Sequence, residues 1–158
     1  MNILSTQYTL QTRSLEIYVA GCSGNPHCTG CHNPETWGFD IGDKYDENYY
    51  FSIEQKINVF EKLIDNIMIF GGEPLDQKPN ELLTLLSDLS HLDKKIWLFT
   101  RYDISDVPKK VKELCDYIKC GRYIPELAVD TNIQFGIKLA TSNQKIYKKG
   151  IDYESCTK

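Results

Sequence analysis

The chain has 158 residues and a formal net charge of −4, with 41% hydrophobic and 25% charged residues. This length and composition fit one soluble globular domain with a single core. The acidic balance and the lack of a basic stripe argue against a nucleic-acid groove or an anionic membrane face, and no apolar run is long enough to cross a bilayer.

The first half of the chain begins with residues 1–12, which lack the pattern of a secretory signal, so we expect a cytoplasmic protein. Residues 15–20 (LEIYVA) are predicted to form a buried strand, and the glycine- and proline-rich residues 23–51 a long loop. A helix is predicted to start at Ser52, which has capping-box spacing with Gln55. Its apolar face is predicted to consist of Ile53, Ile57, Phe60 and Ile64.

The second half of the chain continues the alternation of strands and helices. Further strands are predicted at residues 67–70, 96–100, 115–119 and 137–140. One helix is predicted to have Pro79 in its first turn, and a short helix is predicted over residues 105–114 with Pro108 in its first turn. The buried face of the longer helix is predicted to consist of Leu82, Leu83, Leu85, Leu86 and Leu89.

This order of elements predicts an α/β fold with a mostly parallel sheet. Active sites in such folds gather at the carboxyl ends of the strands. Glycine, cysteine and polar residues follow four of the predicted strands, at residues 21–22, 71–73, 100–102 and 120–122. We therefore expect a single functional site at this edge of the sheet.

Three of the six cysteines form the pattern C-x5-C-x2-C at Cys22, Cys28 and Cys31. Thiols stay reduced in the cytoplasm, so this cluster indicates metal ligands or catalytic groups rather than disulfides. Three thiolates fit a four-iron cluster that keeps one iron open for an outside ligand. A structural zinc site with His27 or His32 as fourth ligand is a second interpretation. The remaining cysteines are predicted to be buried in or beside a strand (Cys115, Cys120) or free (Cys156).

Two further interpretations of the cysteine cluster fit less well. Residues 28–32 match the C-x-x-C-H of c-type haem attachment, but that attachment requires export and leaves Cys22 unexplained. A thioredoxin-like redox pair normally opens a helix, whereas this segment lies in a turn-rich loop between Pro26 and Pro34.

Several segments resemble the radical S-adenosylmethionine (SAM) superfamily. Residues 22–37 resemble the cluster loop of its activating enzymes, and residues 69–75 (IFGGEPL) resemble its G-G-E-P segment. Over residues 15–147 the chain is similar, more narrowly, to the anaerobic ribonucleoside-triphosphate reductase-activating family, which makes glycyl radicals. This narrower likeness also rests on the segments at residues 31–37, 96–102, 121–123 and 142–144.

The chain departs from the pattern it resembles at two places. The superfamily commonly has C-x3-C-x2-C, whereas this loop has two extra residues and keeps all three cysteines. Cys120 stands where the family often has an aspartate, so no role of that aspartate is carried over.

The resemblance implies an incomplete (β/α) barrel in one radical SAM domain, residues 1–158, with its core at about 15–147 and a tail at 148–158. It implies that Cys22, Cys28 and Cys31 bind a [4Fe–4S] cluster and serve catalysis, with SAM on the fourth iron. Cleavage of SAM to a 5′-deoxyadenosyl radical would generate the glycyl radical on the large subunit of anaerobic ribonucleoside-triphosphate reductase. A flavodoxin-like protein is the expected electron donor.

The resemblance also implies which residues contact SAM. The two glycines of the G-G-E segment are expected to let backbone approach the methionine moiety, and its glutamate to accept a hydrogen bond from the ammonium group. The full expected set is Gly30, Cys31, His32, Gly71, Gly72, Glu73, Thr100 and Asn143. Two other functions stay open: a short radical SAM enzyme acting on a small molecule, of the queuosine-pathway type, and a zinc-stapled interaction module without enzymatic activity.

Overall fold

The computed structural model describes residues 1–153. Its main sheet contains the strands β1 (Asn2–Thr9), β2 (Ser14–Val19), β3 (Asp43–Lys44), β4 (Asn66–Gly71), β5 (Lys95–Phe99), β6 (Tyr117–Cys120) and β9 (Lys145–Lys148). The helices are α1 (Glu47–Val59), α2 (Pro79–Ser90) and α3 (Lys109–Leu114). A separate two-stranded sheet pairs β7 (Ile133–Gln134) with β8 (Ile137–Lys138).

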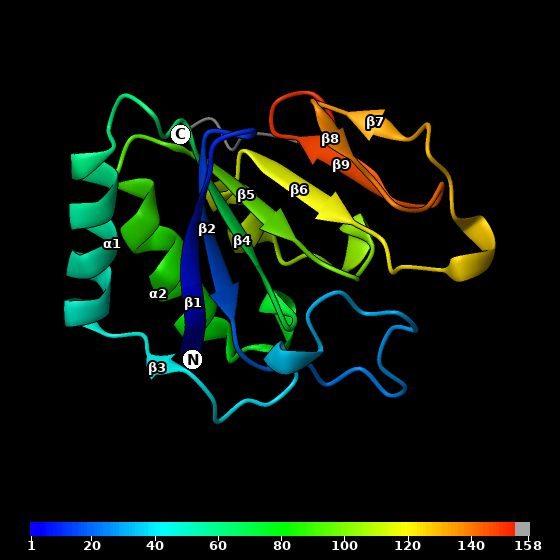
Figure 1. Ribbon diagram of the computed structural model, residues 1–158, viewed down its shortest axis with the longest axis horizontal. Coiled ribbons are helices and arrows are strands. Elements are labelled where there is room, and N and C mark those ends of the chain that lie inside the picture. Colours follow the sequence, from blue (N-terminus) through cyan, green and yellow to red (C-terminus); the bar gives the residue numbers. More distant parts are fainter. Residues whose placement is uncertain (154–158) are drawn as a thin grey trace.

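The centre of the main sheet is parallel, as the sequence predicts. The strand order is β3-β1-β2-β4-β5-β6-β9, and the pairs β2–β4, β4–β5 and β5–β6 are parallel (Figure 1). Antiparallel strands flank this centre, with β1 beside β2 and β9 beside β6. The α/β class is therefore confirmed, and the sheet is open, with β3 and β9 as its edges.

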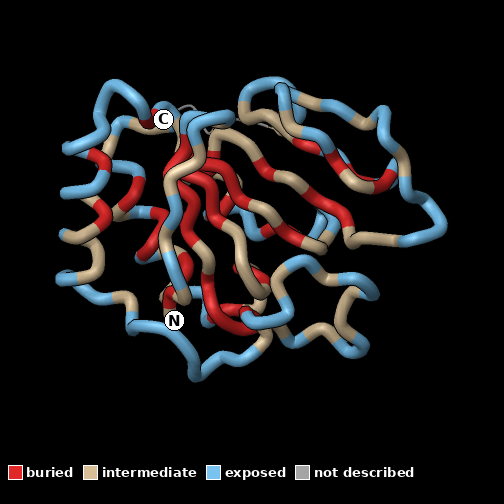
Figure 2. The backbone as a smooth tube through the Cα atoms, viewed as in Figure 1, coloured by how far each residue is buried: buried red, intermediate tan, exposed pale blue. Residues whose placement is uncertain are grey.

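Alternate side chains of the central strands pack on opposite faces of the sheet. Ile69 and Leu98 belong to the core shared with the helices, whereas Met68 and Trp97 belong to a smaller core on the other face. Both faces are thus covered near the middle of the sheet, where Figure 2 shows the buried backbone concentrated. Burial on both faces explains why these strands appear in the sequence as continuous apolar runs rather than alternating ones.

The predicted start of the first helix is wrong. Helix α1 begins five residues before Ser52, because the Asp46 side chain caps it by accepting a hydrogen bond from the backbone N–H of Tyr49 at 3.0 Å. Ser52 lies inside the helix and donates its hydroxyl to the Tyr49 carbonyl. The predicted apolar face also ends early, since Phe60 is the C-cap and is 43% exposed.

Three boundaries in the second half also differ from prediction. The predicted helix over 105–114 is divided into a 3₁₀ turn, Ile104–Asp106, and α3, with Pro108 as the N-cap between them. Strand β6 starts two residues late because Cys115 still closes α3. The predicted strand over 137–140 is the short β8, which pairs with β7 instead of joining the main sheet.

The end of the chain adds the last strand of the main sheet. Lys148 ends β9, and Lys149 bridges to Tyr153 in the predicted tail. Cys156 lies outside the described residues. Up to residue 153, no helix has the length and apolar character needed to span a membrane.

Candidate iron–sulfur site

A cavity of about 240 Å³ opens where β2, β4, β5 and β6 end. The predicted ligand cysteines line it, together with most of the residues expected to contact SAM. The members of the predicted set that line the cavity are Cys22, Cys28, Gly30, Cys31, His32, Gly71, Gly72, Glu73 and Thr100. The strand ends therefore converge as the sequence predicts, since carboxyl ends of parallel strands meet at one edge.

Asn143 is the one expected contact residue that does not line the cavity. Its side-chain amide is exposed and donates to the Arg122 carbonyl at 2.9 Å. The neighbouring Gln144 lines the cavity instead and is 6% exposed. The Gln144 side chain accepts from the backbone N–H of Ala140 and donates to the Gly121 carbonyl, so it fixes the chain at the rim.

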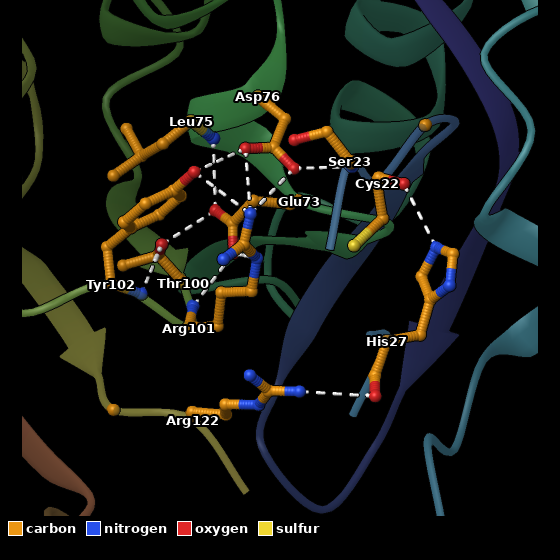
Figure 3. A network of polar contacts seen from close by, with 12 residues as sticks. Cys22, Ser23, His27, Glu73, Leu75, Asp76, Thr100, Arg101, Tyr102 and Arg122 are labelled. Atoms are coloured by element: carbon orange, nitrogen blue, oxygen red, sulfur yellow. Dashed lines mark hydrogen bonds and ion pairs between the residues drawn. The ribbon is translucent and has the colours of Figure 1, made fainter. Parts of the chain in front are cut away.

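The three cysteines are free, half-buried thiols on a loop that other residues hold in place. The Cys22 N–H donates to the Trp37 carbonyl at 3.0 Å. The His27 ring stacks on the Trp37 ring at 4.0 Å, and its Nε2 lies 3.1 Å from the Cys22 carbonyl oxygen. Arg122 donates to the carbonyl of His27 (Figure 3) and to that of Pro26. The two extra residues of the loop are thus part of an anchored turn.

The donor set consists of thiols, and thiolates bind both iron–sulfur clusters and zinc. Within residues 1–153, no three His, Cys, Asp or Glu side chains are grouped as the ligands of one metal ion. In a cubane the three thiolates bind three different irons. Burial raises the pKa of the Cys22 thiol, so metal binding would have to displace its proton.

The structure shows why residues 71 and 72 must be glycine, for a reason other than contact with a ligand. A Cβ on Gly71 would lie 2.2 Å from the Val19 carbonyl oxygen, and φ of this residue is +116°. A Cβ on Gly72 would lie 2.1 Å from the Gly21 oxygen and 2.7 Å from the Thr36 oxygen. The end of β4 therefore needs glycine in order to pack against the end of β2 and the cysteine loop.

The Glu73 carboxylate already accepts hydrogen bonds on both oxygens. The residue is 2% exposed, and its Oε1 accepts from the Thr100 hydroxyl at 2.6 Å and from the Leu75 N–H at 3.0 Å. Its Oε2 accepts from the Arg101 N–H at 2.8 Å (Figure 3). Burial raises the pKa of this carboxyl, and the hydrogen bonds oppose that shift. Glu73 thus joins the end of β4 to the end of β5.

Lys119 is a cavity residue that the sequence analysis did not single out. Its ammonium group donates to the Gly121 carbonyl at 2.7 Å, and within residues 1–153 it has no ion-pair partner. Burial lowers the pKa of Lys119 to about 8. The sequence analysis includes it only as the last residue of the predicted strand 115–119, and the folded sheet places it in the same cavity wall as the cysteines.

Three thiols at the carboxyl edge of an open α/β sheet place the protein in the class that binds a metal ion or an iron–sulfur cluster through thiolates. The model of the family described as 4Fe-4S single cluster domain matches residues 12–147, and the chain belongs to this family. The family supports the predicted cluster and confirms the iron–sulfur part of the resemblance.

More particularly, the chain is similar to proteins named anaerobic ribonucleoside-triphosphate reductase-activating protein. The protein from Haemophilus influenzae is 26% identical over 140 residues, which cover 84% of this chain and 85% of the relative. The one from Vibrio cholerae has the same identity and coverage. The one from Escherichia coli strain K12 is 25% identical over 137 residues, covering 83% of this chain and 85% of the relative.

Proposed function

We propose that this protein is a radical SAM enzyme that installs the glycyl radical on an anaerobic ribonucleoside-triphosphate reductase. The observation that carries the proposal is the meeting of three free cysteines and the G-G-E segment in one cavity. The names of the relatives and the 4Fe-4S family support it. When bound, the cluster and SAM would supply one-electron cleavage of the sulfonium bond, leading to hydrogen abstraction from a glycine Cα of the partner.

In this proposal Cys22, Cys28 and Cys31 hold three irons and leave the fourth for SAM. The cavity suits the zwitterionic methionine moiety because it offers groups of both signs, the Glu73 carboxylate and the Lys119 ammonium. Gly30, Cys31 and His32 lie on the same wall segment and are assigned to the adenine. Thr100 is assigned a supporting role, since its hydroxyl is already engaged with Glu73.

We interpret the open sheet as an incomplete barrel of the radical SAM type. Helices cover one face of the sheet, and the opposite face carries Phe70 and Phe99 beside the cavity, with ring centroids 4.1 Å apart. In the proposed complex the large subunit of the reductase covers this side and presents its glycine to the cavity. A flavodoxin-like protein is proposed as the electron donor.

The proposed function predicts a specific metal content and a specific loss on mutation. Anaerobically reconstituted protein is expected to carry about four iron and four sulfide per chain, and Cys22→Ala to carry far less. Cys156→Ala removes a cysteine predicted to be free and serves as the matched control. Chemical iron and sulfide analysis measures both, and one zinc per chain would contradict the assignment.

The partner is tested by mixing reduced protein, SAM and the reductase and recording the electron paramagnetic resonance spectrum. A glycyl-radical doublet on the reductase is expected. Cleavage of SAM without that doublet would instead favour an enzyme acting on a small molecule.

A further inference from the structure

Asp76 connects the cysteine loop to the ends of two strands. It closes the 3₁₀ turn Pro74–Asp76 that follows the G-G-E segment, and its side chain is 3% exposed. The carboxylate accepts from the Ser23 N–H at 2.7 Å, from the Tyr102 hydroxyl at 2.7 Å, and from Arg101 Nη2 at 3.1 Å (Figure 3). These bonds hold the pKa of Asp76 below its usual range despite burial.

The next residue, Gln77, holds the other side of the same loop. It is 6% exposed, and its side-chain amide donates to the Ala20 carbonyl at 2.9 Å and to the Gly21 carbonyl at 3.3 Å. The backbone is therefore fixed at the two residues before Cys22 by Gln77 and at the residue after it by Asp76.

Neither Asp76 nor Gln77 lines the cavity, so any effect on the site passes through the backbone that they hold. Cys22 receives this support on both sides, while Cys28 and Cys31 lie farther along the loop. The loop before Cys28 is held by Arg122, which donates to the Pro26 and His27 carbonyls. For Cys22, side chains hold both neighbours in the chain, Gly21 and Ser23.

We propose that Asp76 and Gln77 are positioning residues that hold Cys22 in place for its iron through the backbone on both sides. This inference rests on the proposed cluster. It adds the residues that fix the position of Cys22 before the cluster binds. The Asp76–Arg101 ion pair serves the same end, because it keeps the carboxylate aimed at the Ser23 amide. Groups that orient metal ligands without touching the metal commonly change metal affinity by about 10- to 100-fold when removed.

The test compares Asp76→Ala and Gln77→Met with wild type and with Asp106→Ala. Asp106 is the matched control because it ends another short 3₁₀ turn, Ile104–Asp106, and is exposed. Both test variants are expected to lose iron to a chelator about 10-fold faster or more, and the control to lose it at the wild-type rate. Iron loss at the wild-type rate in both test variants would overturn the proposal.

A second readout needs no cluster. Amide hydrogen exchange in the apo-protein is expected to be faster at Ser23 in Asp76→Ala and unchanged in the control, since the carboxylate is the acceptor of that amide. Asp76→Asn keeps one acceptor oxygen and is expected to restore both protection and iron retention in part, which a loss of global stability alone would not produce. It also takes the place of Asp76→Ala if the alanine variant does not fold.

The failure of this inference is distinguishable from failure of the proposed function. If wild type binds no iron, the function fails, whatever the exchange at Ser23 shows. If wild type binds the cluster and the variants retain it equally well, only the positioning role is lost.

Discussion

Lys119 carries the least compensated charge of the site. Its ammonium group faces a cavity and, among residues 1–153, has a single hydrogen-bond acceptor, the Gly121 carbonyl. Desolvation disfavours the protonated form, so the folded protein pays for this placement unless a ligand supplies a negative group. Such a residue is expected at a binding site, where an anionic group of the ligand would offset the desolvation free energy of the ammonium.

We predict that Lys119→Met stabilises the apo-protein at pH 7 by about 2–4 °C in the midpoint of thermal unfolding, corresponding to roughly 1 kcal/mol. The pKa of Lys119 is about 8 in the folded protein, below its ordinary value of 10.5. The unfolded chain therefore binds more protons between these values, and stability rises with pH there. The advantage of the variant should be full below pH 8 and fade toward pH 10.5.

The exposed Lys110→Met is the control for this experiment. It is expected to leave the midpoint unchanged at every pH. A Lys119→Met protein that is less stable than wild type at pH 7, or an advantage that grows with pH, would contradict this account of the cavity.

The single residues that the sequence could predict are those that belong to local motifs. Cys22 stands in a cysteine pattern that indicates thiolate ligands, and Glu73 stands in a segment that resembles the G-G-E-P segment of the radical SAM superfamily. Asp76 and Gln77 have no such signal, because the partners named above are 53 and 57 residues away along the chain. Lys119 has its acceptor two residues away, but only the folded sheet places it in the wall of the cavity. The sequence therefore indicates the expected ligands. It does not indicate the side chains that fix the backbone of the cysteine loop or the one that places a positive charge in the cavity.

The end of β4 passes close to β2 and to the cysteine loop. The Gly72 N–H donates to the Val19 carbonyl at 2.9 Å, and the Glu73 N–H donates to the Gly21 carbonyl at 2.8 Å. These bonds leave no room for a side chain on Gly72. The position of the G-G-E segment is thus coupled to that of Cys22.

We predict that Gly72→Ala destabilises the apo-protein by about 1–3 kcal/mol and weakens cluster binding, because its methyl group would collide with two carbonyl oxygens. Urea unfolding and iron analysis measure the two effects. Gly136→Ala is the matched control, since it has φ of +78° and nothing within 4 Å of an added Cβ. This variant has the backbone strain of an alanine at positive φ but no collision of its methyl group. It is expected to retain the full iron content.

If both glycine variants lose equal stability and both retain iron, close packing at the end of β4 is not what the site requires. That outcome would return the role of Gly72 to direct contact with a ligand.

The central strands and α2 are predictable because their apolar runs are long and bounded by glycine and proline. The outer strands are not. Strand β9 has the sequence KIYK with only Ile146 buried, and β1 has one buried residue, Ile3, among eight. Such outer strands form because a neighbouring strand offers backbone hydrogen bonds, and a largely polar sequence carries no record of that neighbour.

The helices and the candidate site lie at different parts of the main sheet. Residues of α1, α2 and α3 all belong to the core on one face of the sheet. The cavity opens at the carboxyl edge, beside the aromatic part of the other face. An unclosed sheet leaves this side accessible to a large partner. The parallel centre of the sheet follows from the alternation of strands and helices and was predicted, whereas the antiparallel strands at both flanks depend on contacts across the whole chain.

The central claim is that the protein supplies three iron ligands and leaves one iron free for SAM. Electron paramagnetic resonance of the reduced protein, recorded before and after SAM is added, tests it most directly. We predict a [4Fe–4S]⁺ signal whose g-values change on addition of SAM. Adenosine, which lacks the methionine moiety, is expected to leave them unchanged. A signal that SAM leaves unchanged, with every iron already ligated by side chains of the chain, would contradict the account.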